Sequence, residues 1–212
     1  MWKYCCLIIV VVIQACGGKE NVDEGLPFYV TADFTPHWFT EKELKGQIHQ
    51  IPDFSFINQS GQAVTASTVQ NKIYVANFFF TNCPGICKRL TNNVSLVQDA
   101  FVNDDEILIL SHSVTPEADS VGRLQQYAKQ YKINQSQWHL LTGNRGDIYS
   151  IARKAYFADE DLGETQNEND FLHTENVLLI DKHRRIRGVY KGTSETDIRN
   201  LITDIKRLKK ES

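Results

Sequence analysis

Long apolar runs alternate with amphipathic stretches over most of the chain. Three runs are continuous and lack the alternation of a half-exposed strand, which predicts strands covered on both faces. They are KIYVANFFF at Lys72–Phe80, EILILS at Glu106–Ser111 and WHLLTG at Trp138–Gly143. Two later runs, NVLLID and IRGVY, flank the charged turn DKHRR and predict a hairpin.

Stretches with helical spacing of apolar residues follow these strands. Pro84 suits the first position of the first helix, and Thr115 with Pro116 suits the cap and first position of the second. Ser194 and Asp197 resemble a capping box ahead of the last helix. Strands that alternate with helices and end in a hairpin plus helix predict an α/β sandwich. The apolar positions expected to face inward are Ile86, Leu90, Val94, Val97, Phe101, Val121, Leu124, Ala128, Tyr131, Ile148, Ile151, Ala152, Ala155, Ile198, Leu201, Ile202, Ile205 and Leu208.

The region before the first long strand divides into a leader, a tether and a hairpin. Alternating Phe54 and Phe56, a turn through Gly61 and a return strand at Ala63–Thr65 predict an N-terminal β-hairpin extension of the sandwich. The tether carries an aromatic cluster, FYVTADFTPHWF, part of which we expect to pack on the domain. The expected organisation is a signal peptide at 1–15, a tether at 16–50 and one domain at 51–212.

The first residues indicate export. Lys3 precedes an apolar run of ten residues, Tyr4 to Ile13, which is too short to span a bilayer as a helix. Ala15, Cys16 and the glycines that follow resemble a bacterial lipoprotein signal, in which cleavage leaves a lipid-bearing cysteine. A plain secretory signal with an incidental cysteine is the alternative. Lipidation at Cys16 predicts a cell-envelope protein, held on a membrane with its domain in the periplasm or otherwise outside the cytoplasm.

Charge excludes one class of partner. The formal net charge is -3, with Lys+Arg 23 against Asp+Glu 26, so the chain has no broad basic footprint for nucleic acid. Acidic residues concentrate in FADEDLGETQNEND at Phe157–Asp170, which contains no basic residue. This stretch is either a solvated loop or a mobile, cation-attracting flap beside a site.

Candidate chemistry centres on the cysteines that remain after export. Removal of Cys5 and Cys6 with the leader and lipidation of Cys16 leave Cys83 and Cys87, which are separated by three intervening residues, at a strand-to-helix junction. A helix N-terminus lowers thiol pKa and favours the thiolate that metal binding and redox chemistry both need. A structural disulfide closing so small a loop would remove little unfolded-state entropy. The spacing is wider than that of thioredoxin-like redox motifs and favours a chelate without excluding a disulfide.

A soft metal held by two thiolates needs a further donor. The sole methionine is Met1, so a thioether is excluded and histidine remains. His37 and His49 lie in the tether, His139 suits a half-buried strand position and His183 a charged turn. His112 follows a strand at its carboxyl end, where sites on open α/β sheets collect. His173 lies just before the NVLLID strand, at an entry point that faces the cysteine-bearing helix in a thioredoxin-like sandwich.

Four segments, in order and spacing, resemble the SCO/SenC family of thioredoxin-fold copper chaperones of respiratory oxidase assembly. They are FFFTNCPGIC, SVTPEADSVGRLQQYAKQY, WHLLTG and HTENVLLID, and the similarity runs from about Ile51 to Leu208. The resemblance implies that Cys83, Cys87 and His173 are copper ligands, able to hold Cu(I) and, with added donors, Cu(II). It implies a metallochaperone rather than an enzyme, with thiol–disulfide reduction as a further capacity. Its partners would be a respiratory oxidase subunit or another copper carrier.

The chain departs from the family pattern at three positions. Lys88 stands where proline usually follows the second cysteine, Thr115 where aspartate often precedes proline, and Leu172 where aspartate often precedes the histidine. The missing acids are candidates for groups that orient ligands, so metal affinity and oxidation-state preference are open; Asp170 or the acidic loop is a candidate replacement.

Two alternatives to copper handling remain. One is a general thiol–disulfide oxidoreductase or peroxidase of the same fold. Thioredoxin-like oxidoreductases resemble one another in a cis-proline before the strand that enters the final hairpin, whereas here Glu175 occupies about that place. The other is a non-catalytic lipoprotein whose cysteines form a disulfide, which predicts no influence of His173 on the cysteines.

Overall fold

The first predicted buried strand forms β5 (Ile73–Phe79), at the centre of the sheet. The structure, a computed structural model, describes residues 25–44, 48–158 and 174–211. No helix within these ranges is long and apolar enough to cross a bilayer. The other elements are β1 (Phe28–Tyr29), β2 (Pro36–His37), α1 (Glu41–Leu44), β3 (Ser55–Asn58), β4 (Ala63–Thr65), α2 (Cys87–Ala100), β6 (Ile107–Ser113), α3 (Val121–Gln130), β7 (Trp138–Thr142), α4 (Arg145–Lys154), β8 (Asn176–Ile180), β9 (Ile186–Lys191) and α5 (Glu195–Glu211).

The described strands form one mixed sheet in the order β2-β1-β9-β8-β5-β6-β7-β3-β4. β5, β6 and β7 run parallel, as strands joined by crossover helices do, and β8, β9 and β3 pair antiparallel with their neighbours. The carboxyl ends of β5 and β6 therefore lie side by side, with Phe78 opposite His112 and Phe79 opposite Ser113. The loop that carries the cysteines starts at this edge.

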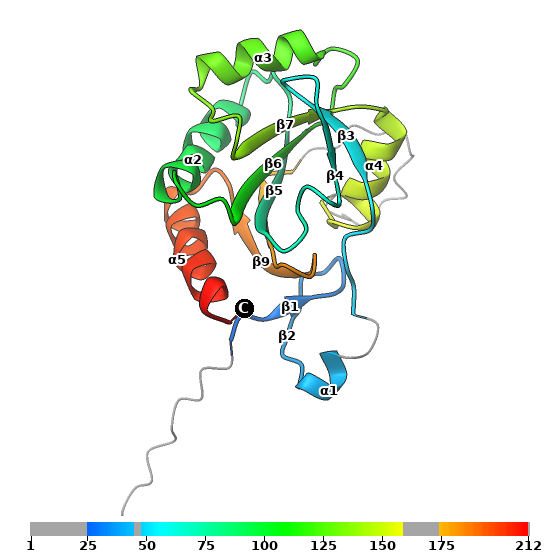
Figure 1. The fold of residues 1–212 in the computed structure, drawn as a ribbon, viewed down its shortest axis with the longest axis vertical. Helices are drawn as coiled ribbons and strands as arrows, with labels where there is room; N and C mark the ends of the chain where they lie inside the picture. The colour runs from blue at the N-terminus through cyan, green and yellow to red at the C-terminus, as the bar shows by residue number, and fades with distance from the viewer. Residues whose placement is uncertain (1–24, 45–47, 159–173, 212) are drawn as a thin grey trace, which may run out of the picture.

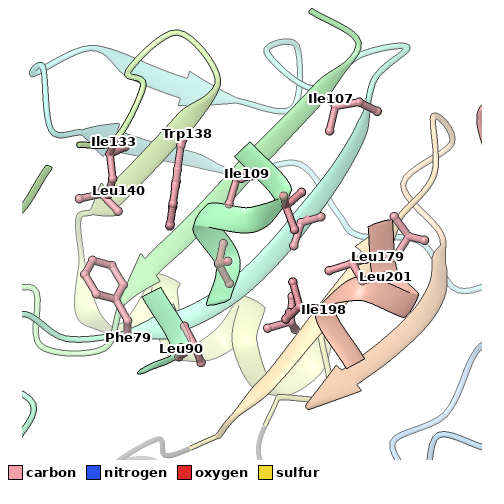
Figure 2. Close-up of a cluster of buried hydrophobic side chains, with 14 of the residues drawn as sticks. Phe79, Leu90, Ile107, Ile109, Ile133, Trp138, Leu140, Leu179, Ile198 and Leu201 are labelled. Atoms are coloured by element: carbon pink, nitrogen blue, oxygen red, sulfur yellow. The ribbon is translucent and has the colours of Figure 1, made fainter. Parts of the chain in front are cut away.

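Helices cover both faces of the sheet (Figure 1). Side chains of α2, α3 and α5 pack on one face, and those of α4 pack on the other. Figure 2 shows the first core, where Phe79 from β5, Leu90 from α2 and Ile198 from α5 point into one cluster. Alternate strand residues, among them Tyr74 and Leu110, reach the second core. The predicted α/β sandwich is confirmed.

Part of the aromatic cluster of the N-terminal segment packs on the domain, as predicted, whereas its Trp38 is 52% exposed. β1 pairs antiparallel with β9, and the ring of Phe28 is buried beneath Arg187, whose guanidinium carbon lies 4.0 Å from the ring centroid. Arg187 also donates to the backbone oxygens of Leu26 at 2.5 Å and Pro27 at 3.0 Å. It pairs with Glu211 of α5 at 2.8 Å, so one buried cation joins the first and last described elements of the fold.

Two local sequence signals act as predicted. β3 and β4 form an antiparallel hairpin whose turn contains Gly61, with a φ of 75° that suits glycine. Ser194 caps α5: its hydroxyl accepts a hydrogen bond from the backbone N–H of Asp197 at 3.3 Å and donates to the Asp197 carboxylate at 3.1 Å. Short-range hydrogen bonding decides both features, so the local sequence suffices to find them.

Two predicted helix starts are wrong. α2 begins at Cys87 rather than Pro84, and α3 begins at Val121, after the N-cap Ser120, rather than at Pro116. Long-range hydrogen bonds from Thr81 to Asp119 hold the chain before α2 in a turn. The residues after Thr115 close a separate turn before α3 starts. Proline at a first helical position is a local preference, and tertiary contacts override it here.

Candidate metal centre

Cys83 and Cys87 lie in the connection between β5 and α2. Cys83 belongs to the turn after the strand, whereas Cys87 is the first residue of the helix. Both side chains are buried, 7% and 5% exposed, and both are free thiols. A hydrogen bond joins the two thiols, so the predicted convergence of the sulfurs is present although Cys83 is not helical.

The pKa values of the two thiols shift in opposite directions. Burial opposes ionisation of Cys83, but hydrogen bonds from the Cys87 thiol and from the backbone of Cys87, Gly85 and Ile86 outweigh it, so the pKa of Cys83 falls below its usual value. Burial, with the hydrogen bond to Cys83, raises the pKa of Cys87 to about 12. The predicted lowering by the helix N-terminus is thus right for Cys83 and wrong for Cys87. Cys83 is the more readily ionised nucleophile or ligand of the pair.

A small cavity of about 10 Å³ adjoins Cys87. Its volume is about that of one water probe, so it admits an ion or a water rather than an organic ligand. Thr174, the first described residue after the acidic loop, lines this cavity opposite the start of α2. The remaining lining residues are apolar: Phe78, Phe79, Phe80, Ile86 and Val114.

The third predicted ligand, His173, lies outside the described residues. The same holds for the predicted lipidation site Cys16, for Leu172 and Asp170, and for the acidic loop beyond Ala158. Within the described ranges, no three His, Cys, Asp or Glu side chains gather closely enough to hold a metal. The described part of the site is therefore the thiol pair and the cavity wall.

His112 does not join the cysteines. Residues of β6 alternate between the two cores: Ile109 belongs to the α2 side, while Leu110 faces the α4 side. His112 shares the parity of Leu110 and stacks on Phe78, with ring centroids 5.2 Å apart. The structure therefore does not bring this candidate donor to the thiols, because the sheet lies between its ring and the core that contains Cys87.

The environment of His112 is apolar. Its side chain is 0% exposed, and within the described part of the chain neither ring nitrogen makes a hydrogen bond of good geometry; a weak contact with the Asn77 backbone only partly offsets the effect of burial on its pKa. The rings of Phe56, Phe78 and Tyr156 surround the imidazole, with centroids 5.2 to 5.5 Å away. Burial lowers its pKa to about 4, so the imidazole is neutral at pH 7.

The other described histidines have structural surroundings. The ring nitrogen Nδ1 of His139 lies 3.3 Å from the side-chain amide of Asn58, so this histidine is satisfied as expected, but it is buried rather than half-buried. The ring nitrogen Nε2 of His49 lies 2.7 Å from the carbonyl oxygen of Ala155. His37 stacks on Phe39 in the N-terminal segment.

Sequence reasoning missed the group that holds the cysteine loop. Asp119 is 1% exposed and accepts hydrogen bonds from Thr81, two residues before Cys83, and from Thr115. Thr115, noted as a departure from the expected aspartate, thus binds an aspartate four residues later. The available signal was an acid among the small polar residues after a buried strand, but its partner Thr81 is 38 residues away.

Comparisons with known proteins agree with this architecture. The sequence model of the SCO1/SenC family matches residues 42–210. The SCO1 protein homolog of Bacillus subtilis is 27% identical over 160 residues, which cover 74% of this chain and 82% of that protein.

Solved structures of the same family share the fold. A SCO1/SenC family lipoprotein from Bacillus anthracis has a TM-score of 0.65 at 27% identity, covering 76% of this chain and 95% of that one. ScoI of Bradyrhizobium japonicum with copper bound has a TM-score of 0.59 at 22% identity, covering 74% and 98%. These neighbours confirm the predicted thioredoxin-like sandwich. The chain belongs to the SCO1/SenC family.

Proposed function

We propose that this protein is a copper-binding metallochaperone that delivers copper to a respiratory oxidase copper site, or reduces the cysteines of that site. The observation that carries the proposal is the pair of free, buried, mutually hydrogen-bonded thiols at the start of α2. Similar proteins add support: BsSco, 25% identical with a TM-score of 0.62, is described as a member of the Sco family of cytochrome c oxidase assembly proteins. The recipient would be an oxidase subunit or another copper carrier.

Cys83, Cys87 and His173 form the ligand set of this proposal. Two thiolates and an imidazole suit Cu(I), and added donors would be needed for Cu(II). Thr174, the residue that follows His173 in the sequence, lines the cavity beside Cys87, which supports His173 as the third ligand. The apolar wall of the cavity would limit water access to a bound ion.

Reduction of a target disulfide uses the same two thiols. The Cys83 thiolate attacks one target sulfur, and the second target sulfur leaves as a thiolate that takes up a proton. Cys87 then loses its proton and attacks the sulfur of Cys83, which releases the first target sulfur. Two electrons pass to the target, and the chain ends as a Cys83–Cys87 disulfide. The lowered pKa of Cys83 supports its role as attacking thiol, and burial of Cys87 supports a resolving role.

A general thiol–disulfide oxidoreductase is the second candidate function. The lowered pKa of Cys83 beside the raised pKa of Cys87 favours it. The surroundings of Glu175 argue against it. Its carboxylate pairs with Lys191 at 2.9 Å and accepts a hydrogen bond from Thr193, and no cis peptide bond occurs in the described ranges. The cis-proline expected in such oxidoreductases is therefore replaced by an ion-paired residue.

The proposed location is the cell envelope, with lipid on Cys16 and the domain in the periplasm or otherwise outside the cytoplasm. The signal-like leader and the small residues around Cys16 support this placement.

Copper titration of the fully reduced chain from Gly17 onward tests the proposal. We expect one Cu(I) per chain, and Cys83→Ser, Cys87→Ser and His173→Ala should each weaken binding by tenfold or more, because each removes a ligand. His183→Ala, which removes an imidazole from the distant β8–β9 turn, is the matched control and should bind as the native chain does. Full affinity in His173→Ala would refute the three-ligand site. Failure of the native chain to bind copper, together with rapid turnover of a disulfide substrate, would favour the oxidoreductase.

A further inference from the structure

A buried carboxylate lies beside the cysteine loop and outside the proposed ligand set. Asp119 accepts hydrogen bonds from the hydroxyls of Ser113 at 2.6 Å and Thr115 at 3.1 Å, both on its own side of the loop. It also accepts from the Thr81 hydroxyl at 2.5 Å and the Thr81 backbone N–H at 3.3 Å. Burying a carboxylate is costly unless donors surround it, so these bonds fix the carboxylate and its partners relative to one another.

Arg123 of α3 donates hydrogen bonds to the same loop. Its Nε donates to the Thr81 hydroxyl at 3.1 Å, and its Nη2 donates to the side-chain oxygen of Asn82 at 2.6 Å. The Thr81 hydroxyl therefore accepts from a guanidinium while it donates to a carboxylate. Each of these two bonds has one charged group, and such a hydrogen bond is roughly twice as strong as a bond between neutral groups.

Between Asn82 and α2 the loop backbone makes few hydrogen bonds to the rest of the fold, and its other bonds run within the loop, from the backbone of Gly85, Ile86 and Cys87 to the Cys83 thiol. Cys83 donates its backbone N–H to Phe80 only at a long 3.4 Å, Pro84 has no N–H to donate, and Gly85 lacks a side chain. The bonds of Thr81 and Asn82 are thus the strong anchors on the strand side of Cys83. On the other side, α2 itself anchors Cys87.

We infer that Asp119 is a positioning residue, which holds Thr81 so that the Cys83 sulfur stays within reach of Cys87. Such pre-organisation lowers the ordering cost of joining both sulfurs to one metal or to each other. Asp119 touches neither sulfur, and its effect passes through the backbone of Thr81 and Asn82. The inference concerns the free dithiol, and only its copper measurement rests on the proposed function.

Four variants of the full chain test this role. Asp119→Asn weakens the acceptor, and Thr81→Val removes the hydroxyl but keeps the shape. Thr81→Ser restores the hydroxyl. Ser111→Ala is the matched control, since it removes a buried β6 hydroxyl that bonds Asn77 and Trp138 rather than the loop.

Two measurements apply to these variants. Hydrogen–deuterium exchange of the reduced, metal-free chain should be about tenfold faster across residues 81–87 in Asp119→Asn and Thr81→Val, because a charge-assisted anchor is lost. Cu(I) affinity should fall about tenfold in the same two variants, as for other groups that orient ligands. Thr81→Ser and Ser111→Ala should match the native chain in both.

Each outcome decides the inference. If Thr81→Val and Asp119→Asn exchange and bind like Ser111→Ala, Asp119 does not position the loop. If Asp119→Asn fails to fold, Thr81→Val with its Thr81→Ser rescue gives the answer. A native chain that binds no copper would refute the proposed function, while the exchange measurement would still test the role of Asp119.

Discussion

The face of the sheet on which a strand side chain lies decides which groups that side chain can contact. His112 illustrates this, because it is the second-to-last residue of β6, a strand in which every residue is buried. A continuous apolar run predicts a buried strand but does not tell which side chains face which layer. The sequence therefore predicted that His112 lies at the carboxyl end of a strand, but it did not predict the face of the sheet to which the imidazole points. The thiol pair needed no such information, since its residues are close in sequence.

Acid stability should depend on His112. Burial holds the pKa of the folded imidazole at about 4, against 6.5 for the exposed group. As pH falls below about 6.5 the unfolded chain gains a proton that the folded chain does not, so stability present above that pH is lost progressively down to about pH 4. Urea unfolding at pH 7 and pH 4.5 should show roughly 2–3 kcal/mol less acid loss in His112→Leu than in the native chain. An equal loss in both proteins would show that this imidazole is not the acid-sensitive group.

The strand β1, next to the edge strand β2, depends on partners that are distant in sequence. We expect Arg187→Met to release β1, because it keeps the apolar stem over Phe28 but removes the donors to Leu26, Pro27 and Glu211. Loss of a buried cation that leaves its partners unpaired costs about 3–5 kcal/mol. Limited proteolysis around Phe28, followed with urea unfolding, measures the effect.

Arg199→Met is the control for this element. Arg199 pairs with Glu195 on the exposed side of α5 at 2.6 Å, with 67% of its side chain exposed. Such a pair contributes about 0–1 kcal/mol, so the variant should resist protease as the native chain does. Equal resistance of Arg187→Met would mean that strand pairing alone holds β1.

The limits of prediction at this scale were set by long-range bonds. The hairpin around Gly61 and the cap at Ser194 follow from neighbouring residues and were predicted. The start of α2 was not, because Thr81 is held by Asp119 and no local pattern reports that bond. Features that neighbouring residues determine could thus be predicted from the sequence. Helix boundaries that depend on side chains distant in sequence could not.

Across the whole molecule, copper loading and oxidation should exclude each other. Cu(I) and a Cys83–Cys87 disulfide both require the same two sulfurs, so we expect copper to stabilise only the reduced chain. At a free Cu(I) concentration a thousandfold above Kd the gain is about 4 kcal/mol. Thermal unfolding of the reduced and oxidised chains in a Cu(I) buffer measures it. Equal stabilisation of both forms would place the metal elsewhere.

The pairing of β1 with β9 also limits how far the folded domain can lie from a membrane that holds the lipid on Cys16. Leu26 is fixed by Arg187 and by a bond from its own backbone N–H to Glu211 at 2.9 Å. With the proposed lipid on Cys16, about ten residues join the membrane surface to the folded domain, and they span at most about 35 Å when fully extended. The protein would therefore reach only recipients whose copper-accepting cysteines lie within this distance of the same bilayer. Residues inserted before Leu26 would lengthen the tether and extend that distance.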